Sequence, residues 1–243
     1  MAAVFLLEQI VNGLLVGGYY LLLALGLSMI FSLGGVVNLA HGAFYALGAY
    51  FAIEITKYAG FGGALVASPL LVGLLGILFE RFLLRRFYSA DPIIGLLLTF
   101  GLAMVVEQLI RMVWGAAPLP ASIPSALRGN ITVGEFLYSR YRMTMLGVVV
   151  VVLIAIWLLL NKTAFGRVVR AGVQKPDMVA VLGIRLQPYM TAIVVIGVGL
   201  AALAGVVTAE SGRVYTFALL VNGAEILGAR AALDELTSAI RES

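Results

Sequence analysis

The sequence of 243 residues contains no cysteine and only one histidine, His41. Without cysteine, disulfide bonds, thiol nucleophiles and thiolate metal sites are excluded. A single histidine also gives no cluster of metal-ligating residues, so we expect neither a metal nor a cofactor. The GxxxxGK(S/T) loop that binds nucleotide phosphates is absent. A catalytic nucleophile and base cannot be placed around one histidine, so we expect no catalytic residues and no enzymatic activity.

Charge is also scarce. Only 12% of the residues are charged and 62% are hydrophobic, whereas soluble domains contain about 25% charged residues. The mean hydropathy of +1.08 is too high for a soluble chain of this length to bury its apolar surface. The formal charge of +4 resides in loops between apolar runs, where it sets membrane topology. We therefore expect the lipid bilayer as a partner and no binding of nucleic acid.

Long apolar runs define the fold class. A bilayer core requires about 20 apolar residues per helix, and six runs reach or approach that length: 4–32, 36–56, 61–80, 92–113, 143–160 and 188–208. The runs do not alternate between polar and apolar residues, which favours helices over barrel strands. The sequence predicts an all-α integral membrane protein, a polytopic transmembrane helix bundle of about six spans within residues 1–209. A seventh, shorter stretch at 214–228 is expected to be a partial or interfacial element.

Basic residues distinguish the two ends of this bundle. The loops near 81–92 and 161–187 are separated by two spans and therefore lie on one side. Together they carry eight basic residues: Arg81, Arg85, Arg86, Lys162, Arg167, Arg170, Lys175 and Arg185. The intervening loop, 114–142, carries three, so the first two loops are expected in the cytoplasm. The N-terminus then lies outside if both early segments span fully, and inside if the second is broken or re-entrant.

Small residues recur four positions apart inside two of the runs. Gly13 and Gly17 form one such pair, and Ala201 and Gly205 form another. This spacing lets helix backbones approach closely in lipid. Ordinary bundle packing is the favoured interpretation, over a role in a substrate path.

The loop at 161–187 is expected to form two short helices. Pro176 suits the first turn of a helix and Gly183 suits a helix end, so a break near Lys175–Pro176 is predicted. A helix of about seven residues is marginal alone and requires a surface on which to dock. The alternative is a basic loop that rests at the lipid headgroups.

The stretch "VVNLAHGAFYALGAY", residues 36–50, places polar groups in an apolar run. Asn38, His41 and Gly42 fall within about one helical turn, and Gly34 and Gly35 just upstream make a break in the helix tolerable. We expect Asn38 and His41 to face the bundle interior near that break. They are candidates, with Gly42, for a substrate path. The same pair could instead pin a broken helix to its neighbour, which is the usual role of a polar pair in a bundle.

Two segments together carry a family resemblance. The N-terminal "NGLLVGGYYLLLALGLSMIFSLGGVVNLAHGAFYALGAY" and the loop "GRVVRAGVQKPDMVAVLGI" resemble the permeases of branched-chain amino acid ABC transporters, the LivH-like subfamily. The likeness covers about residues 8–207. It implies a multi-pass permease of the cell inner membrane, and a loop that couples to an ATPase subunit. The coupling residues implied are Arg167, Arg170, Gln174, Asp177 and Gly183.

The resemblance also implies partners and a substrate class. The partners are cytoplasmic ATP-binding subunits, a second permease subunit or homodimer partner, and a periplasmic substrate-binding protein. The implied substrates are branched-chain or other apolar amino acids, with amides or urea as related possibilities. The alternative function is a self-sufficient secondary transporter or channel for small solutes. Such carriers bury ionisable residues for ion coupling, whereas Glu54, Glu80, Glu107 and Arg111 mostly fall near span ends, which favours the ABC permease.

The C-terminal tail, residues 210–243, departs from the family pattern. Its charges interrupt any apolar run of about 20 residues, at Glu210, Arg213, Glu225 and Arg230. We expect a divergent tail that does not complete the transport pathway, as a truncated or frameshifted reading frame would produce.

Overall fold

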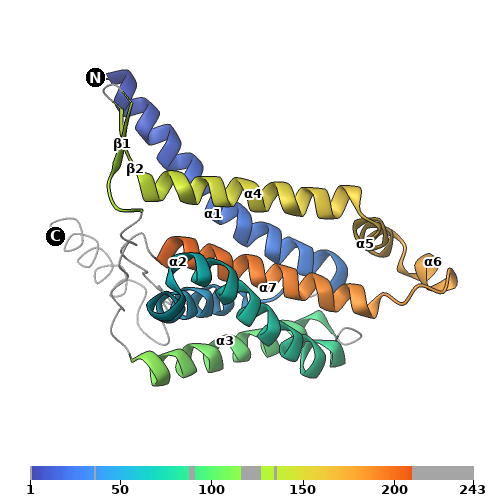
Figure 1. The fold of residues 1–243 in the computed structure, drawn as a ribbon. Helices are drawn as coiled ribbons and strands as arrows, with labels where there is room; N and C mark the ends of the chain where they lie inside the picture. The colour runs from blue at the N-terminus through green and yellow to red at the C-terminus, as the bar shows by residue number, and fades with distance from the viewer. Residues whose placement is uncertain (1, 36, 88–90, 116–126, 134–135, 210–243) are drawn as a thin grey trace, which may run out of the picture.

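The structure is a computed structural model that describes residues 2–35, 37–87, 91–115, 127–133 and 136–209. Its long helices run side by side, and the shorter elements lie at the two ends of the bundle (Figure 1). The elements, in chain order, are α1 (Ala2–Gly34), α2 (His41–Phe82), the 3-10 helix η1 (Leu84–Arg86), α3 (Pro92–Trp114), strands β1 (Asn130–Val133) and β2 (Phe136–Ser139), α4 (Arg140–Lys162), α5 (Ala164–Gln174), α6 (Pro176–Val181) and α7 (Gln187–Ala209).

Five helices within the described residues are long and apolar enough to cross a membrane: α1, α2, α3, α4 and α7. Helix α2 accounts for two of the six expected runs. Its 42 residues would extend about 63 Å if straight, twice the thickness of a hydrocarbon core. The expected count of six therefore corresponds to five helices, one of which must be folded back on itself.

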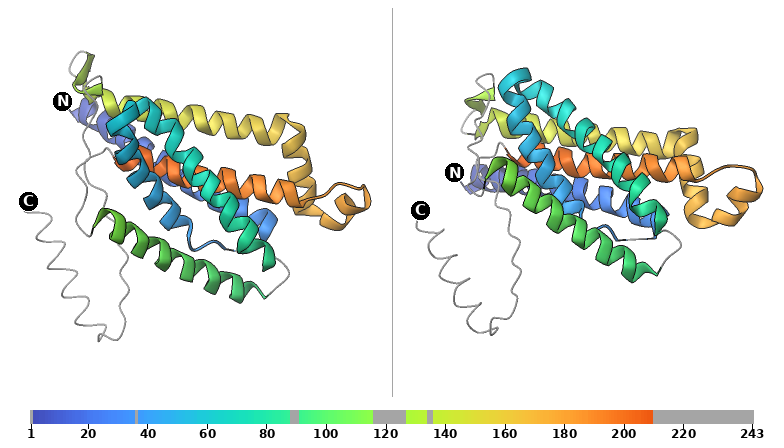
Figure 2. Two further views of the ribbon diagram at one scale, coloured as in Figure 1. Left: turned by 60° about the horizontal axis from the view of Figure 1, so that its bottom comes forward. Right: turned by 90° about the horizontal axis from the view of Figure 1, so that it is seen from below.

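Helix α2 reverses direction at Gly60, whose φ of 67° and ψ of 177° lie outside the helical region. The rings of Phe44 and Phe79, near opposite ends of α2, have centroids 5.5 Å apart. The Ser68 hydroxyl donates a hydrogen bond of 2.7 Å to the carbonyl of Gly48. Residues 41–59, the first arm, and residues 61–82, the second arm, therefore pack antiparallel (Figure 2). The first arm begins five residues later than the expected run at 36–56, because 37–40 are not helical.

Helix α7 is the centre of the described bundle. Within its most apolar window 67% of the residues are buried, against 11% for α4. It packs against both α1 and α2. Two hydroxyl contacts add to this packing: Tyr45 on the first arm lies 2.6 Å from the Thr208 hydroxyl, and Tyr141 on α4 donates to the carbonyl of Val207. Helix α7 is therefore in contact with α1, α2 and α4.

Glycines allow the backbones around α7 to touch. A Cβ atom added at Gly197 would lie 2.6 Å from the carbonyl oxygen of Gly26 on α1. A Cβ at Gly48 would overlap the backbone of Ala202, and one at Gly205 would overlap the carbonyl of Tyr45. The expected packing role of Gly205 is thus confirmed. No described atom of this chain lies within 4 Å of a Cβ added at Gly13 or Gly17, so the pair packs against none of the described helices.

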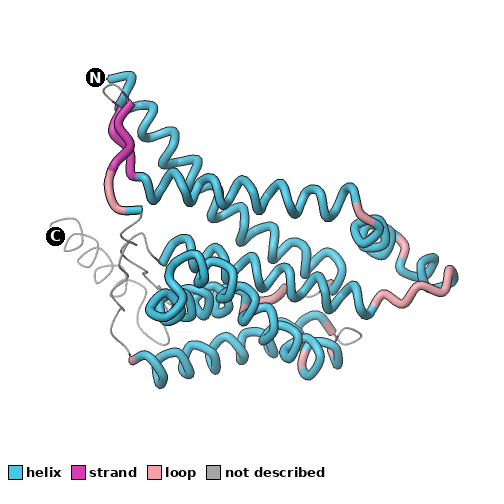
Figure 3. The backbone as a smooth tube through the Cα atoms, viewed as in Figure 1, coloured by secondary structure: helices cyan, strands magenta, loops and turns pink. Residues whose placement is uncertain are grey.

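A short β-hairpin, which the sequence did not predict, joins α3 to α4. Strands β1 and β2 pair antiparallel, with Asn130 opposite Ser139. The Tyr138 hydroxyl and Arg142 Nη1 each donate a hydrogen bond of 2.9 Å to Asn12 Oδ1 on α1. This hairpin lies at the same end of the bundle as the N-terminus, whereas η1, α5 and α6 lie at the opposite end (Figures 1 and 3). The two arginine-rich loops therefore share one end, as predicted.

The contact between Gly48 and Ala202 predicts opposite effects for two glycine-to-alanine changes. Gly48→Ala forces the first arm away from α7, and overpacking of this kind costs about 1–3 kcal/mol. Gly147→Ala on α4 adds a methyl group where no atom lies within 4 Å, and alanine is the better helix former by about 1 kcal/mol. Thermal unfolding of the purified chain in detergent should show a lowered midpoint for Gly48→Ala alone. Equal midpoints for both variants would contradict the packing described here.

Candidate functional site

The connection between α1 and α2 is an irregular break lined by polar groups. Helix α1 closes at Gly35, whose N–H donates to the carbonyl of Phe31 over 2.9 Å. Gly35 has a φ of +66°, a left-handed conformation that glycine adopts without strain. The glycine pair that suggested a break in the sequence therefore supplies the residue that ends the helix.

Asn38 organises the turn into α2. Its side chain is 2% exposed, and its Oδ1 atom accepts a hydrogen bond of 3.0 Å from the N–H of Ala40. Its backbone carbonyl accepts a second bond from the N–H of His41, over 3.2 Å. This arrangement is an Asx-turn, in which an asparagine side chain replaces part of the backbone hydrogen bonding. The buried position predicted for Asn38 is confirmed.

His41 fixes the first arm to α1. Its ring is buried, and its Nε2 atom lies 3.1 Å from the carbonyl oxygen of Leu23. A carbonyl only accepts hydrogen bonds, so the geometry assigns the proton to Nε2 and leaves Nδ1 as an acceptor. Gly26 makes room for the ring, since an added Cβ there would lie 3.1 Å from Cε1 of His41. The interior position predicted for His41 is also confirmed.

Thr99 of α3 completes the break, and sequence reasoning missed it. The N–H of Leu39 donates to the Thr99 hydroxyl over 3.1 Å. That hydroxyl in turn lies 3.3 Å from the carbonyl of Val37 and 3.1 Å from the carbonyl of Leu96. The one available signal was an isolated hydroxyl in the apolar first half of the run at 92–113.

Two polar atoms at the break remain without a hydrogen-bond partner among the described residues: Asn38 Nδ2 and His41 Nδ1. One is a donor and the other is an acceptor, and both are buried. Such groups are costly when unpaired, so the site is suited to a water molecule or a polar ligand. Gly42 differs from them, because it is exposed and has no atom within 4 Å of an added Cβ. The three candidate path residues thus divide into two inside the bundle and one at its surface.

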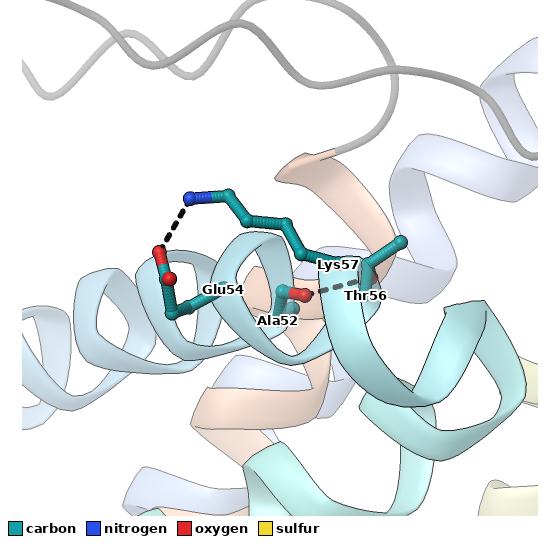
Figure 4. A network of polar contacts seen from close by, with 4 residues as sticks. All are labelled: Ala52, Glu54, Thr56 and Lys57. Carbon is teal, nitrogen blue, oxygen red and sulfur yellow. Dashed lines mark hydrogen bonds and ion pairs between the residues drawn. The ribbon is translucent and has the colours of Figure 1, made fainter.

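The carboxylates considered for ion coupling all have partners. Glu54 accepts a hydrogen bond of 2.7 Å from Lys57 at the far end of the first arm (Figure 4). Glu107 is paired with Arg111 one turn away on α3. Glu80 is 1% exposed and accepts a bond of 2.8 Å from the Thr191 hydroxyl.

The segment after α4 forms the two short helices that the sequence predicted. Helix α5 ends at Gln174, Lys175 leaves the helical region, and Pro176 opens α6. Gly183, with a φ of +76°, donates to the carbonyl of Ala180, while the N–H of Ile184 reaches the carbonyl of Val179. These paired bonds form a Schellman motif, so the predicted roles of Pro176 and Gly183 as helix start and end are confirmed.

Part of this segment, at the basic end of the bundle, is a surface that no other described residue covers. The five candidate coupling residues, Arg167, Arg170, Gln174, Asp177 and Gly183, are all exposed. Three apolar side chains beside them are exposed as well: Met178 by 61%, Val181 by 84% and Leu182 by 75%. Arg170 differs from the rest because its Nη1 atom donates a bond of 2.7 Å to Asn161 Oδ1 on α4. We call the exposed surface of α6 and Leu182 the α6 face.

Residues 9–231 match the family described as the permease component of the branched-chain amino acid transport system. The chain belongs to this family. It is a multi-pass helical membrane protein of a transport family, not of an enzyme family. The match runs beyond residue 209 into the tail, which lies outside the described residues, as do the expectations for residues 210–243.

Individual relatives agree with the family match. The chain is 30% identical to the high-affinity branched-chain amino acid transport system permease protein BraD of Pseudomonas aeruginosa, over 82% of this chain and 69% of the relative. It is 27% identical to the permease protein LivH of Escherichia coli, over 85% and 71% of the two chains. A probable LivH of Methanocaldococcus jannaschii is 27% identical over 76% of this chain and 60% of the relative. No solved structure matches the chain.

The hydrogen bonds at the break predict a graded series of stabilities. His41→Leu removes the bond to Leu23 and should lower the stability of the folded chain by about 1–3 kcal/mol. His41→Gln retains a donor and an acceptor and should be milder. Asn38→Leu should destabilise as well, although leucine is more apolar, because Ala40 loses its acceptor. Thermal unfolding in lipid nanodiscs measures the order, and a His41→Leu variant as stable as the parent would refute it.

Proposed function

We propose that this chain is the membrane-spanning permease subunit of an ABC importer of the cell inner membrane. It translocates branched-chain or related apolar amino acids, and separate ATP-binding subunits supply the energy. The observation that carries the proposal is the unpaired α6 face at the basic end of a chain that belongs to a permease family and has no nucleotide-binding loop of its own.

The basic end of the bundle faces the cytoplasm in this proposal. Positively charged loops are retained on that side of the membrane. Because both arms of α2 have the length of a membrane span, three crossings separate the N-terminus from the loop at 83–91. The N-terminus and the β-hairpin then lie on the outer side, where the periplasmic substrate-binding protein delivers its cargo.

The ATP-binding subunit docks on the α6 face. Met178, Val181 and Leu182 supply apolar contacts, and Gln174 and Asp177 supply polar ones. Helices as short as α6 are marginal in isolation and gain stability from such a partner. Arg170 also attaches α5 to α4 through its bond to Asn161, and its contact with the ATP-binding subunit stays a prediction. The remaining partner is a second permease subunit or a second copy of the chain.

The break at residues 35–40 contributes to the substrate path. A zwitterionic amino acid carries both an acceptor and a donor, its carboxylate and its ammonium group. Asn38 Nδ2 and His41 Nδ1 offer the complementary donor and acceptor. Their other polar atoms hold the break in shape, so pinning and recognition use different atoms of the same two side chains.

A secondary transporter or channel is the second candidate. Ion-coupled carriers rely on ionisable groups inside the membrane. Glu54 and Glu107 are instead partly exposed and paired with a lysine and an arginine on their own helices. These pairings support the ABC importer.

Uptake assays test the proposal directly. The chain should be reconstituted in proteoliposomes with its ATP-binding subunits, second permease subunit and binding protein. Leucine uptake should require ATP inside the vesicles together with the ATP-binding subunits, and isoleucine and valine should compete. Uptake by this chain alone, driven by a proton or sodium gradient, would instead establish the secondary transporter.

In the same assay, His41→Gln should retain more uptake per folded molecule than His41→Leu, and equal uptake would remove His41 from the path.

If the ATP-binding subunit docks on the α6 face, a new charge should weaken the complex there and not at the opposite end of the bundle. Val181→Asp places a carboxylate on the α6 face and should reduce co-purification with the ATP-binding subunit by about tenfold or more. Tyr58→Asp is the matched control, because Tyr58 is 85% exposed at the opposite end of the bundle and Val181 is 84% exposed. Membrane insertion should be intact in both. Unchanged co-purification of Val181→Asp would exclude the α6 face as the docking site.

A further inference from the structure

Glu80 stands apart from the other buried polar residues. In the described structure these are Asn38, His41, Ser68, Glu80 and Thr99, and Glu80 is the one carboxylate among them. It lies near the end of the second arm, at the basic end of the bundle. Burying a carboxylate is expensive, and an ionisable residue inside a membrane protein marks a functional site by default.

The Glu80 carboxylate joins three elements. Its Oε2 atom accepts the hydrogen bond of 2.8 Å from Thr191, near the start of α7. Its Oε1 atom lies 3.8 Å from Nε of Arg85 on η1 and has no hydrogen bond. One oxygen is therefore bonded to α7, while the other lies near a cation without being bonded to it.

The start of α7 also contacts α5. The rings of Phe165 and Tyr189 are stacked, with centroids 5.6 Å apart. Two turns further along the same face of α5, a Cβ added at Gly172 would lie 2.8 Å from Cδ2 of Leu186, just before α7. A continuous series of contacts thus runs from α5 through the start of α7 to Glu80 and the second arm. Helix α6 is joined to this series through its packing on α5.

We propose that Glu80 is a positioning residue that transmits movement of α5 and α6 to the second arm of α2. This inference rests on the proposed function. While Thr191 holds Oε2, the second arm follows the start of α7. When that bond breaks, the carboxylate pairs with Arg85, whose Nε lies 3.8 Å from Oε1. The pairing is favourable because an unpaired buried charge is costly. The exchange of partners gives the contact two discrete arrangements, which is what transmission between sites requires.

A purely static pin between the second arm and α7 is the competing interpretation. It predicts that loss of the contact lowers the amount of folded importer. ATP hydrolysis and uptake would then fall together. A transmitting contact predicts instead that hydrolysis continues while uptake fails. The number of ATP molecules hydrolysed per leucine imported separates the two, since it does not depend on how much protein is folded.

The test uses the complete importer in proteoliposomes, with Glu80→Gln, Glu80→Asp and Thr191→Val. Glu80→Gln removes the charge that attracts Arg85, and Thr191→Val removes the donor hydroxyl at nearly constant volume. In Glu80→Gln and Thr191→Val the ATP consumed per leucine should rise by about fivefold or more. Glu80→Asp keeps the charge and should restore part of the coupling. Glu107→Gln is the control, because it neutralises a carboxylate paired within its own helix, and its ratio should equal that of the parent.

Each outcome decides the proposal. A ratio that stays at the parent value in both Glu80→Gln and Thr191→Val shows a static pin and overturns it. If Glu80→Gln does not fold, Thr191→Val carries the test alone, because the carboxylate retains Arg85. If the parent importer shows no ATP-dependent leucine uptake, the proposed function fails, and this inference fails with it.

Discussion

The close approach of α7 to α1 and to the first arm is the contact on which the rest of the fold depends. Between helices in lipid there is little hydrophobic driving force, so packing and hydrogen bonds must hold the bundle together. Here glycines at Gly26, Gly48, Gly197 and Gly205 let backbones meet without intervening side chains. Helices α3 and α4 expose most of their apolar surface and contribute less to this centre.

The same contact sets up both functional regions. A Cβ added at Gly26 would meet both the carbonyl oxygen of Gly197 and the ring of His41, so the spacing of α1 and α7 affects the room available at the break. At its other end α7 begins beside α5 and is bonded to Glu80. Helix α7 thereby connects α5 with the region proposed to contact substrate. Transport driven by an external ATPase requires a connection of this kind.

The sequence predicted what local chemistry determines. Apolar run length gave the spans, Gly35 with Asn38 gave the break, and Pro176 with Gly183 gave the two short helices. It did not predict the hairpin, whose Tyr138 depends on Asn12 from a distant helix, whereas the gap between the runs at 36–56 and 61–80 did place a reversal near Gly60. The burial of Thr99 and Glu80 was not predicted either. A helix that is apolar on all faces has no amphipathic pattern, so its sequence does not show which face packs against other helices. For the same reason Gly205 could not be told from Gly13 and Gly17, where an added Cβ would meet no described atom within 4 Å.

The central claim is that the α1–α7 contact shapes the break, and labelling of a single cysteine tests it most directly. The chain has no native cysteine, so Gly42→Cys can be labelled with a water-soluble maleimide without interference. Adding Gly197→Ala pushes α7 away from Gly26 and should change the labelling rate at residue 42. Adding Gly147→Ala, on the open face of α4, should leave that rate unchanged. Identical rates in both backgrounds would show that the break keeps its shape independently of α7 and would contradict the account.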